Sequence, residues 1–128
     1  MPRPLLIDPK DCADEKWSDP NRGSYRYRQM LSSSITDSDS FAAGIMTFSA
    51  GDQWAVHRHP EAEVYFGLEG EADVEVDGRL YRLKPETLLF IPGGSFHGVP
   101  PTPDRLRFFY AFATDRLENI SYTFRDEA

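Results

Sequence analysis

The sequence contains a single cysteine, Cys12, and no apolar run that approaches the roughly 20 residues of a membrane-spanning helix. A lone cysteine excludes an intrachain disulfide, and the polar and acidic residues around it give no sign of a reactive thiol. Basic residues are also few: 14 lysines and arginines stand against 21 aspartates and glutamates, for a net charge of −7, and they form no cluster. We therefore expect neither a nucleic-acid partner nor a membrane partner.

The first eight residues lack the shape of a signal peptide, since only Leu5, Leu6 and Ile7 are consecutive apolar residues there. We therefore expect a cytoplasmic protein. The chain of 128 residues, 40% of them hydrophobic, is long enough for one domain with its own core. We expect an irregular N-terminal arm over residues 1–24, with a helical turn across Asp11–Trp17, and a single domain over residues 25–128.

Short apolar runs separated by turn residues predict about nine strands and no long helix. The runs most typical of strands are 25–31, 41–49, 63–68, 72–76, 79–83, 87–91, 97–99, 105–113 and 120–124. Asp77-Gly78 is a strong hairpin signal, and a short helical turn capped by Thr114 is expected over 114–119. Together these features predict an all-β barrel or two-sheet sandwich.

Histidine is rare in this sequence, and all of its histidines belong to one pattern of candidate metal ligands. The three histidines are His57, His59 and His97, and Glu63 follows the first two at close spacing. On a strand, His57 and His59 point to the same face, and Glu63 can join them if a strand resumes after Pro60. His97 follows a Pro-Gly-Gly turn. Three imidazoles and one carboxylate predict a site for a divalent transition metal.

The spacing of these residues resembles the paired motifs of the cupins. Gly51, His57, His59, Glu63 and Gly70 match the first motif at every position, and Pro92-Gly93-Gly94-Ser95-Phe96-His97 matches the core of the second. The second motif departs from the pattern in two places: Glu86 stands in its usual glycine position, and Pro101 replaces the asparagine that often closes it. The resemblance implies a single-domain jelly-roll β-barrel with the metal inside its mouth, and a homodimer that covers edge strands.

Four protein ligands leave two open positions on an octahedral ion, which is typical of catalysis. The ligand set suits Fe, Mn, Ni, Co or Zn, and the sequence does not choose among them. Tyr65 shares the inward face with Glu63 by strand alternation. Trp54, Phe48 and Tyr110 are candidate substrate-binding residues of the cavity wall, with simple core packing as the alternative for each.

The tail carries a second resemblance. The run Phe109-Tyr110-Ala111-Phe112-Ala113-Thr114-Asp115-Arg116, with Tyr122 after it, is similar to the ending of short single-domain cupin lyases that cleave dimethylsulfoniopropionate into dimethyl sulfide and acrylate. That resemblance implies catalytic roles for Tyr65 and Tyr122, one acting as a tyrosinate base whose pKa a nearby cation lowers. It makes a metal-dependent carbon–sulfur lyase acting on a small carboxylate the leading hypothesis. An Fe(II)-dependent dioxygenase and a non-catalytic ligand-binding or sensor cupin are the alternatives.

Overall fold

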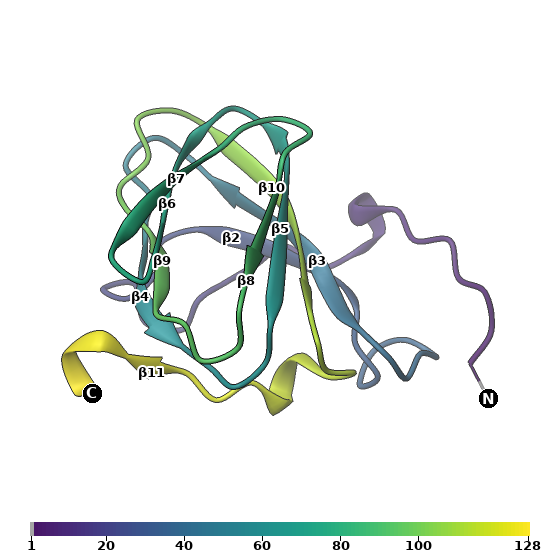
Figure 1. The fold of residues 1–128 in the computed structure, drawn as a ribbon. Coiled ribbons are helices and arrows are strands. Elements are labelled where there is room, and N and C mark those ends of the chain that lie inside the picture. The colour runs from purple at the N-terminus through teal and green to yellow at the C-terminus, as the bar shows by residue number, and fades with distance from the viewer. Residues whose placement is uncertain (1) are drawn as a thin grey trace.

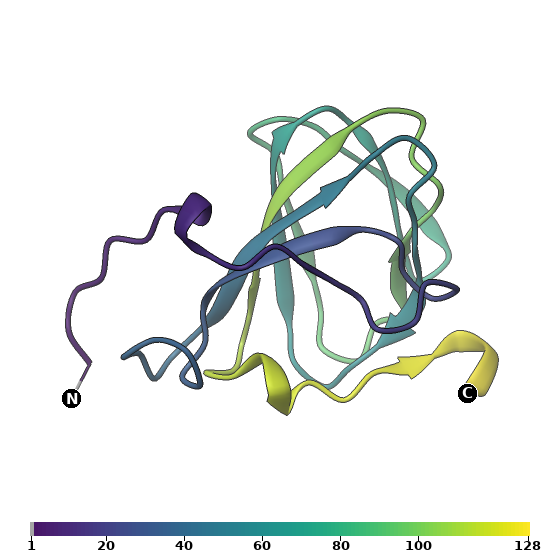
Figure 2. The same ribbon diagram turned by 180° about the vertical axis from the view of Figure 1, so that it is seen from behind.

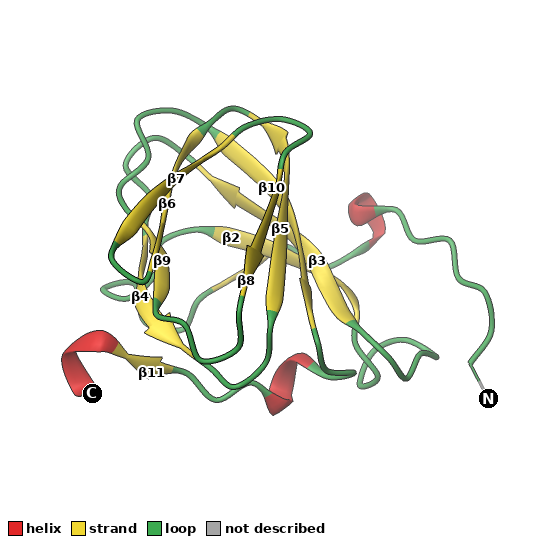
Figure 3. Ribbon diagram, in the orientation of Figure 1, coloured by secondary structure: helices red, strands yellow, loops and turns green. Residues whose placement is uncertain are grey.

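The computed structural model describes residues 2–128, in which eleven strands form two antiparallel sheets and the only helical elements are three short 3₁₀ turns (Figures 1 and 3). The six-stranded sheet comprises, in spatial order, β1 (Glu15–Lys16), β2 (Arg26–Leu31), β3 (Ala42–Phe48), β10 (Leu106–Phe112), β5 (Glu63–Glu69) and β8 (Leu88–Ile91). The five-stranded sheet comprises β11 (Thr123–Phe124), β4 (Trp54–Arg58), β9 (His97–Val99), β6 (Ala72–Val76) and β7 (Arg79–Leu83). The 3₁₀ turns are η1 (Pro9–Asp11), η2 (Leu117–Asn119) and η3 (Arg125–Glu127).

The core lies between the two sheets and follows the period of two that the sequence predicts. On β10, Leu106, Phe108, Tyr110 and Phe112 are buried, while the residues between them are partly exposed. Ala72, Val74 and Val76 on β6 alternate in the same way. Strand alternation therefore places one set of side chains inside the barrel, which confirms the all-β prediction.

The N-terminal segment differs from its prediction. The helical turn expected across Asp11–Trp17 is wrong: η1 ends at Asp11, and β1 pairs with β2 through Glu15↔Tyr27 and Lys16↔Arg26. The Asp14–Arg26 ion pair, at 2.9 Å, supports this pairing. Figure 2 shows the segment running from η1 across the back of the barrel. The division of the chain into an arm and a barrel at residue 25 stays a prediction, and Met1 lies outside the described residues.

The C-terminal segment crosses the lower end of the barrel in Figures 1 and 2. It is held to the barrel by the backbone bond from Ala113 N to Ala62 O and by the pairing of β11 with β4. Two predictions fail here. The last strand covers only Thr123–Phe124, and Thr114 does not cap the turn, because η2 begins after Arg116 and no side chain caps it. No helix within residues 2–128 is long and apolar enough to cross a membrane.

The turn between β7 and β8 has a left-handed backbone conformation at a residue that is not glycine. Glu86, which occupies the usual glycine position of the second motif, has φ of 63°, and its N–H donates to Gly67 O over 2.9 Å. A residue with a Cβ pays roughly 1–2 kcal/mol for this left-handed conformation. The motif therefore retains its turn geometry at some cost in stability.

We expect Glu86→Gly to raise the free energy of unfolding by about 0.5–1 kcal/mol. The substitution relieves the backbone strain, and the greater entropy of glycine in the unfolded chain offsets part of that gain. Chemical denaturation measures the change. Glu86→Ala is the matched control, because it removes the same side chain but keeps the Cβ. An equal gain in the alanine variant would show that backbone strain is not the cause.

Candidate metal centre

The structure brings the three histidines together on the inner face of the barrel. His57 lies on β4 directly opposite His97 on β9, and His59 follows at the end of β4. One nitrogen of each ring lies within 4.8 Å of the others, and the three side chains form a group that can hold a metal ion. Each is almost completely buried, with 1–3% of its surface exposed.

Backbone carbonyls orient all three rings in the same way. The Nδ1 atoms of His57, His59 and His97 lie 2.6, 2.9 and 2.9 Å from the carbonyl oxygens of Ala55, Glu61 and Ser95 respectively. A neutral imidazole that donates its Nδ1–H to a carbonyl presents the lone pair of Nε2 on its other side. Each histidine is therefore set in the tautomer that a metal requires.

Glu63, the first residue of β5, completes the cluster. Its Oε1 lies 3.1 Å from His97 Nε2 and 3.4 Å from His59 Nε2. Its Oε2 and the Nε2 of His59 are buried without a hydrogen-bond partner among the described residues. Buried lone pairs without a donor are costly, and a cation bound by them removes the cost. The residues present therefore fit a divalent metal.

Burial and neighbouring charges set the protonation of the rings. Burial, together with the nearby His97, lowers the pKa of His57 well below its ordinary value. At His59 burial also lowers the pKa, but the nearby carboxylate of Glu63 outweighs it, so the pKa of His59 is raised. The pKa values of His57 and His59 thus shift in opposite directions, and the carboxylate of Glu63 favours positive charge beside His59.

Glycines in the second motif join it to the first. A side chain at Gly93 would collide with Pro60 O, and the N–H of Gly94, at φ of 83°, donates to His59 O over 2.8 Å. Only glycine lets the two loops approach this closely. The turn before His97 is thereby fixed against the end of the His57–His59 strand.

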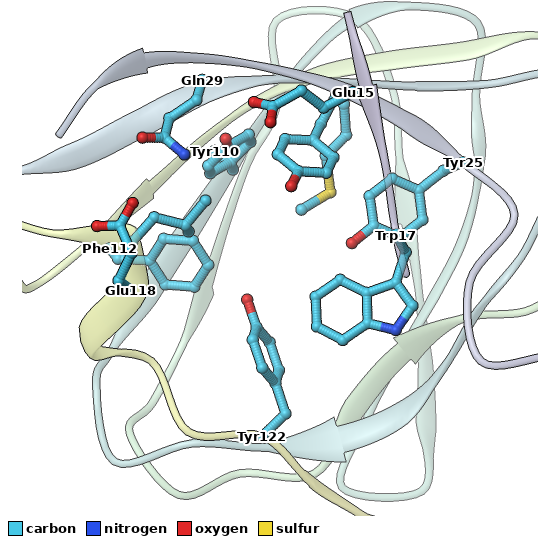
Figure 4. Close-up of a pocket in the computed structure, with 11 residues that line it drawn as sticks. Glu15, Trp17, Tyr25, Gln29, Tyr110, Phe112, Glu118 and Tyr122 are labelled. Atoms are coloured by element: carbon cyan, nitrogen blue, oxygen red, sulfur yellow. The ribbon is translucent and has the colours of Figure 1, made fainter. Parts of the chain in front are cut away.

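An aromatic cavity of about 270 Å³ lies beside the cluster (Figure 4). Its six aromatic lining residues are Trp17, Tyr25, Tyr27, Tyr110, Phe112 and Tyr122. Two of these reach the histidines: the ring centroid of Tyr122 lies 5.4 Å from that of His57, and that of Phe112 lies 5.3 Å from that of His59. Figure 4 shows the hydroxyl of Tyr122 directed toward the middle of the cavity.

The candidate catalytic tyrosines lie in different surroundings. Tyr65 is fully buried, 4.2 Å from Phe108 and 6.5 Å from His97 between ring centroids, and its hydroxyl has no partner among the described residues. Burial, reinforced by the charge of Glu63, raises the pKa of both Tyr65 and Tyr122 far above the ordinary value. The sequence led us to expect a lowered pKa. The difference arises because that expectation depends on the charge of a bound cation, and burial dominates in the protein alone.

Only one of the candidate substrate-binding residues, Tyr110, lines the cavity. Trp54 packs against His57 and Tyr25 at centroid distances of 4.2 and 5.1 Å, and Phe48 stacks on Tyr25 and Phe108. Both are buried in the core, which was the alternative for each.

The cavity residues contributed by the two ends of the chain were not predicted from the sequence. Glu15 and Trp17 come from the N-terminal segment, and Leu117 and Glu118 from η2. The available signal was Trp17, a large aromatic residue in a stretch otherwise rich in polar residues. An isolated tryptophan there indicates that the segment packs against the barrel.

Comparison with known proteins relates this geometry to a family. A family model described as a cupin domain matches residues 44–111. The dimethylsulfoniopropionate lyase DddW of Ruegeria pomeroyi is 34% identical over 125 residues, which are 98% of this chain and 82% of that protein. The 5-nitrosalicylic acid 1,2-dioxygenase of Bradyrhizobium sp. is 31% identical over 67 residues, which are 52% of this chain and 32% of that protein.

A solved structure agrees with these matches. The polyketide cyclase RemF from Streptomyces resistomycificus superposes with a TM-score of 0.81 over 96% of this chain and 86% of its own, at 20% identity. At that identity the likeness concerns the fold alone, and it confirms the jelly roll. The family model covers more than half of the chain and the lyase relative covers nearly all of it. The chain is therefore a member of the cupin family.

Proposed function

We propose that this cupin is a metal-dependent lyase that carries out β-elimination on a small carboxylate substrate such as dimethylsulfoniopropionate. The observation that carries the proposal is the position of Tyr122, whose hydroxyl enters an aromatic cavity while its ring lies 5.4 Å from His57. The 34% identity to the lyase DddW supports the choice of substrate.

The proposed metal ligands are His57, His59, Glu63 and His97. Three imidazole nitrogens and a carboxylate suit Fe, Mn, Ni, Co or Zn, and these ligands alone do not select one of the metals. When bound, such an ion would supply positive charge for the substrate carboxylate and for the charge that develops as the α-proton leaves.

The proposed proton acceptor is a tyrosine, with Tyr122 as the first candidate and Tyr65 as the second. A bound cation would lower the pKa of the phenol. The deprotonated phenol oxygen takes the α-proton, and the electron pair of that C–H bond forms the new C=C bond. The C–S bond breaks with its pair remaining on sulfur, which leaves as neutral dimethyl sulfide, and acrylate remains. Tyr65 is fully buried, whereas Tyr122 is partly buried and lines the cavity, so a substrate bound in the cavity would contact the side chain of Tyr122 directly.

Aromatic rings are proposed to hold the sulfonium end of the substrate. Trp17, Tyr27 and Tyr110 line the cavity, and a cation over such a ring gains about 1–2 kcal/mol when it is desolvated. Tyr110 keeps the substrate-binding role expected from sequence. Trp17 and Tyr27 take the place of Trp54 and Phe48, because the latter two pack in the core.

Quantification of both products tests the proposal. Protein reconstituted with each of the five metals is incubated with dimethylsulfoniopropionate, and dimethyl sulfide and acrylate are measured together. We expect equal amounts, because one elimination releases one molecule of each. An unequal ratio or an oxidised product would contradict β-elimination.

The second candidate function is Fe(II)-dependent dioxygenation. The similarity of about half of the chain to 5-nitrosalicylic acid 1,2-dioxygenase favours it. Dioxygenation requires O₂ and no catalytic tyrosine, so oxygen consumption that persists in a Tyr122→Phe variant would support this alternative. A sensor cupin would bind ligand with no turnover in either assay.

We also propose a cytoplasmic homodimer. The support for pairing is β8, an edge strand of the six-stranded sheet on which Leu88 and Phe90 are 64% and 60% exposed. Exposed apolar edge strands are commonly covered by a partner. Sedimentation velocity measures the oligomeric state, and a monomer at all concentrations would contradict the dimer.

A further inference from the structure

The charged residues at the rim of the aromatic cavity are all acidic. Among its lining residues only Glu15 and Glu118 carry a formal charge, and no lysine or arginine lines it. Glu15 comes from β1 and Glu118 from η2, so the two ends of the chain each contribute one carboxylate (Figure 4). The rim is therefore negative, and the histidine group that can hold a cation lies beside the cavity, next to Tyr122 and Phe112.

The two carboxylates also line a second hollow that adjoins the cavity. A groove of about 600 Å³ lies under the N-terminal arm, and it shares Glu15, Gln29 and Glu118 with the aromatic cavity. Its other charged lining residues, Asp8 and Asp11, are also acidic. The charged residues that line the groove and the cavity are therefore all acidic.

The interior of the cavity also has features that favour a ligand. Tyr110 lines it with 1% of its surface exposed, and its hydroxyl has no hydrogen-bond partner in the described part of the chain. Burial raises the pKa of Tyr27, and the charges of Glu15 and Glu118 raise it further, so both carboxylates act on the cavity wall. Neutral phenol rings and their oxygens favour a positive group at this position.

We propose that Glu15 and Glu118 are specificity-determining residues that select substrates carrying a sulfonium or quaternary ammonium group in addition to the carboxylate. This inference rests on the proposed function, in which the cavity receives the substrate. A zwitterion meets attraction at both ends, whereas a purely anionic carboxylate is repelled at the rim. Glu118 is also 3.6 Å from Arg116 and accepts a hydrogen bond from Ser34, so Glu15 contributes the larger share.

The test compares two ligands of nearly the same shape, glycine betaine and 3,3-dimethylbutanoate, which differ by one positive charge. Neither has a leaving group for β-elimination, so binding is measured independently of lyase activity. Trp17, in the cavity wall and one of two tryptophans, provides a fluorescence signal. We expect the metal-loaded protein to bind the betaine at least tenfold more tightly, and we expect added salt to reduce that preference.

The variants are Glu15→Gln, Glu118→Gln and the double variant, with Glu86→Gln on the exposed β7–β8 turn as the matched control. We expect the preference to fall about tenfold in the double variant, through weaker betaine binding, and to be unchanged in the control. Equal binding of the two ligands by the parent protein, no binding of either, or an unchanged preference in the double variant would overturn the inference. A preference for betaine in a protein that releases no dimethyl sulfide would instead contradict only the lyase proposal.

Discussion

Replacement of His57 or His97 by alanine is expected to remove most of the divalent metal from a protein that otherwise carries close to one ion per chain. Each variant deletes one of three inward-facing nitrogens in a buried group whose atoms lie within 4.8 Å of one another. Loss of a residue that only orients a ligand costs about 10–100-fold in affinity, so loss of the ligand itself costs at least that much. Elemental analysis after reconstitution and dialysis measures the metal content.

Trp54→Phe is the matched control for metal loss. Trp54 packs 4.2 Å from the ring of His57 but contributes no ligand atom, so the variant is expected to keep its metal. Glu63→Gln is expected to bind more weakly than the parent yet better than the histidine variants, because an amide oxygen still coordinates without the charge. Absence of metal from the reconstituted parent, or full retention in both histidine variants, would contradict the metal centre.

Tyr122→Phe is expected to lower turnover of dimethylsulfoniopropionate roughly 10²–10⁴-fold while metal content and fold are retained, because it removes only the proposed base. The hydroxyl faces the cavity, so its loss leaves the packing against Trp17, at 4.8 Å between centroids, in place. Initial rates of dimethyl sulfide release, corrected for bound metal, provide the measurement.

Two further phenylalanine variants locate the base. Tyr65→Phe is expected to reduce turnover to a similar extent if both tyrosines act, without loss of stability, because the buried hydroxyl of Tyr65 has no partner among residues 2–128. Tyr81→Phe, at an exposed position of β7 outside the cavity lining, is the control and should keep the activity of the parent. Full turnover in both Tyr122→Phe and Tyr65→Phe would rule out a tyrosine base.

Sequence reasoning predicted the histidine group because its geometry depends on local rules. Strand alternation sets His57 and His59 on one face, and a glycine turn delivers His97 beside them. The fold followed from the same alternation on β6 and β10. Alternation within each strand depends on residues near one another in the chain, whereas the approach of His97 to the distant His57 was expected from the resemblance to the paired cupin motifs.

The cavity was predicted poorly because it is assembled from distant segments. Its walls join Trp17 from the N-terminal segment to Tyr122 from the C-terminal one, and no periodicity relates positions so far apart. Trp54 and Phe48 share the inward orientation of the cavity residues, but Tyr25 packs against both of them in the core. Alternation identifies the face of a strand and not the depth at which its side chain lies.

The most direct test of metal-dependent elimination is anaerobic incubation of the metal-loaded protein with dimethylsulfoniopropionate, followed by measurement of dimethyl sulfide in the headspace. We expect release without O₂ by the reconstituted protein and none by protein stripped with a chelator, since elimination requires the metal charge but no oxidant. Release that needs O₂, or no release with Fe, Mn, Ni, Co or Zn, would contradict the lyase function.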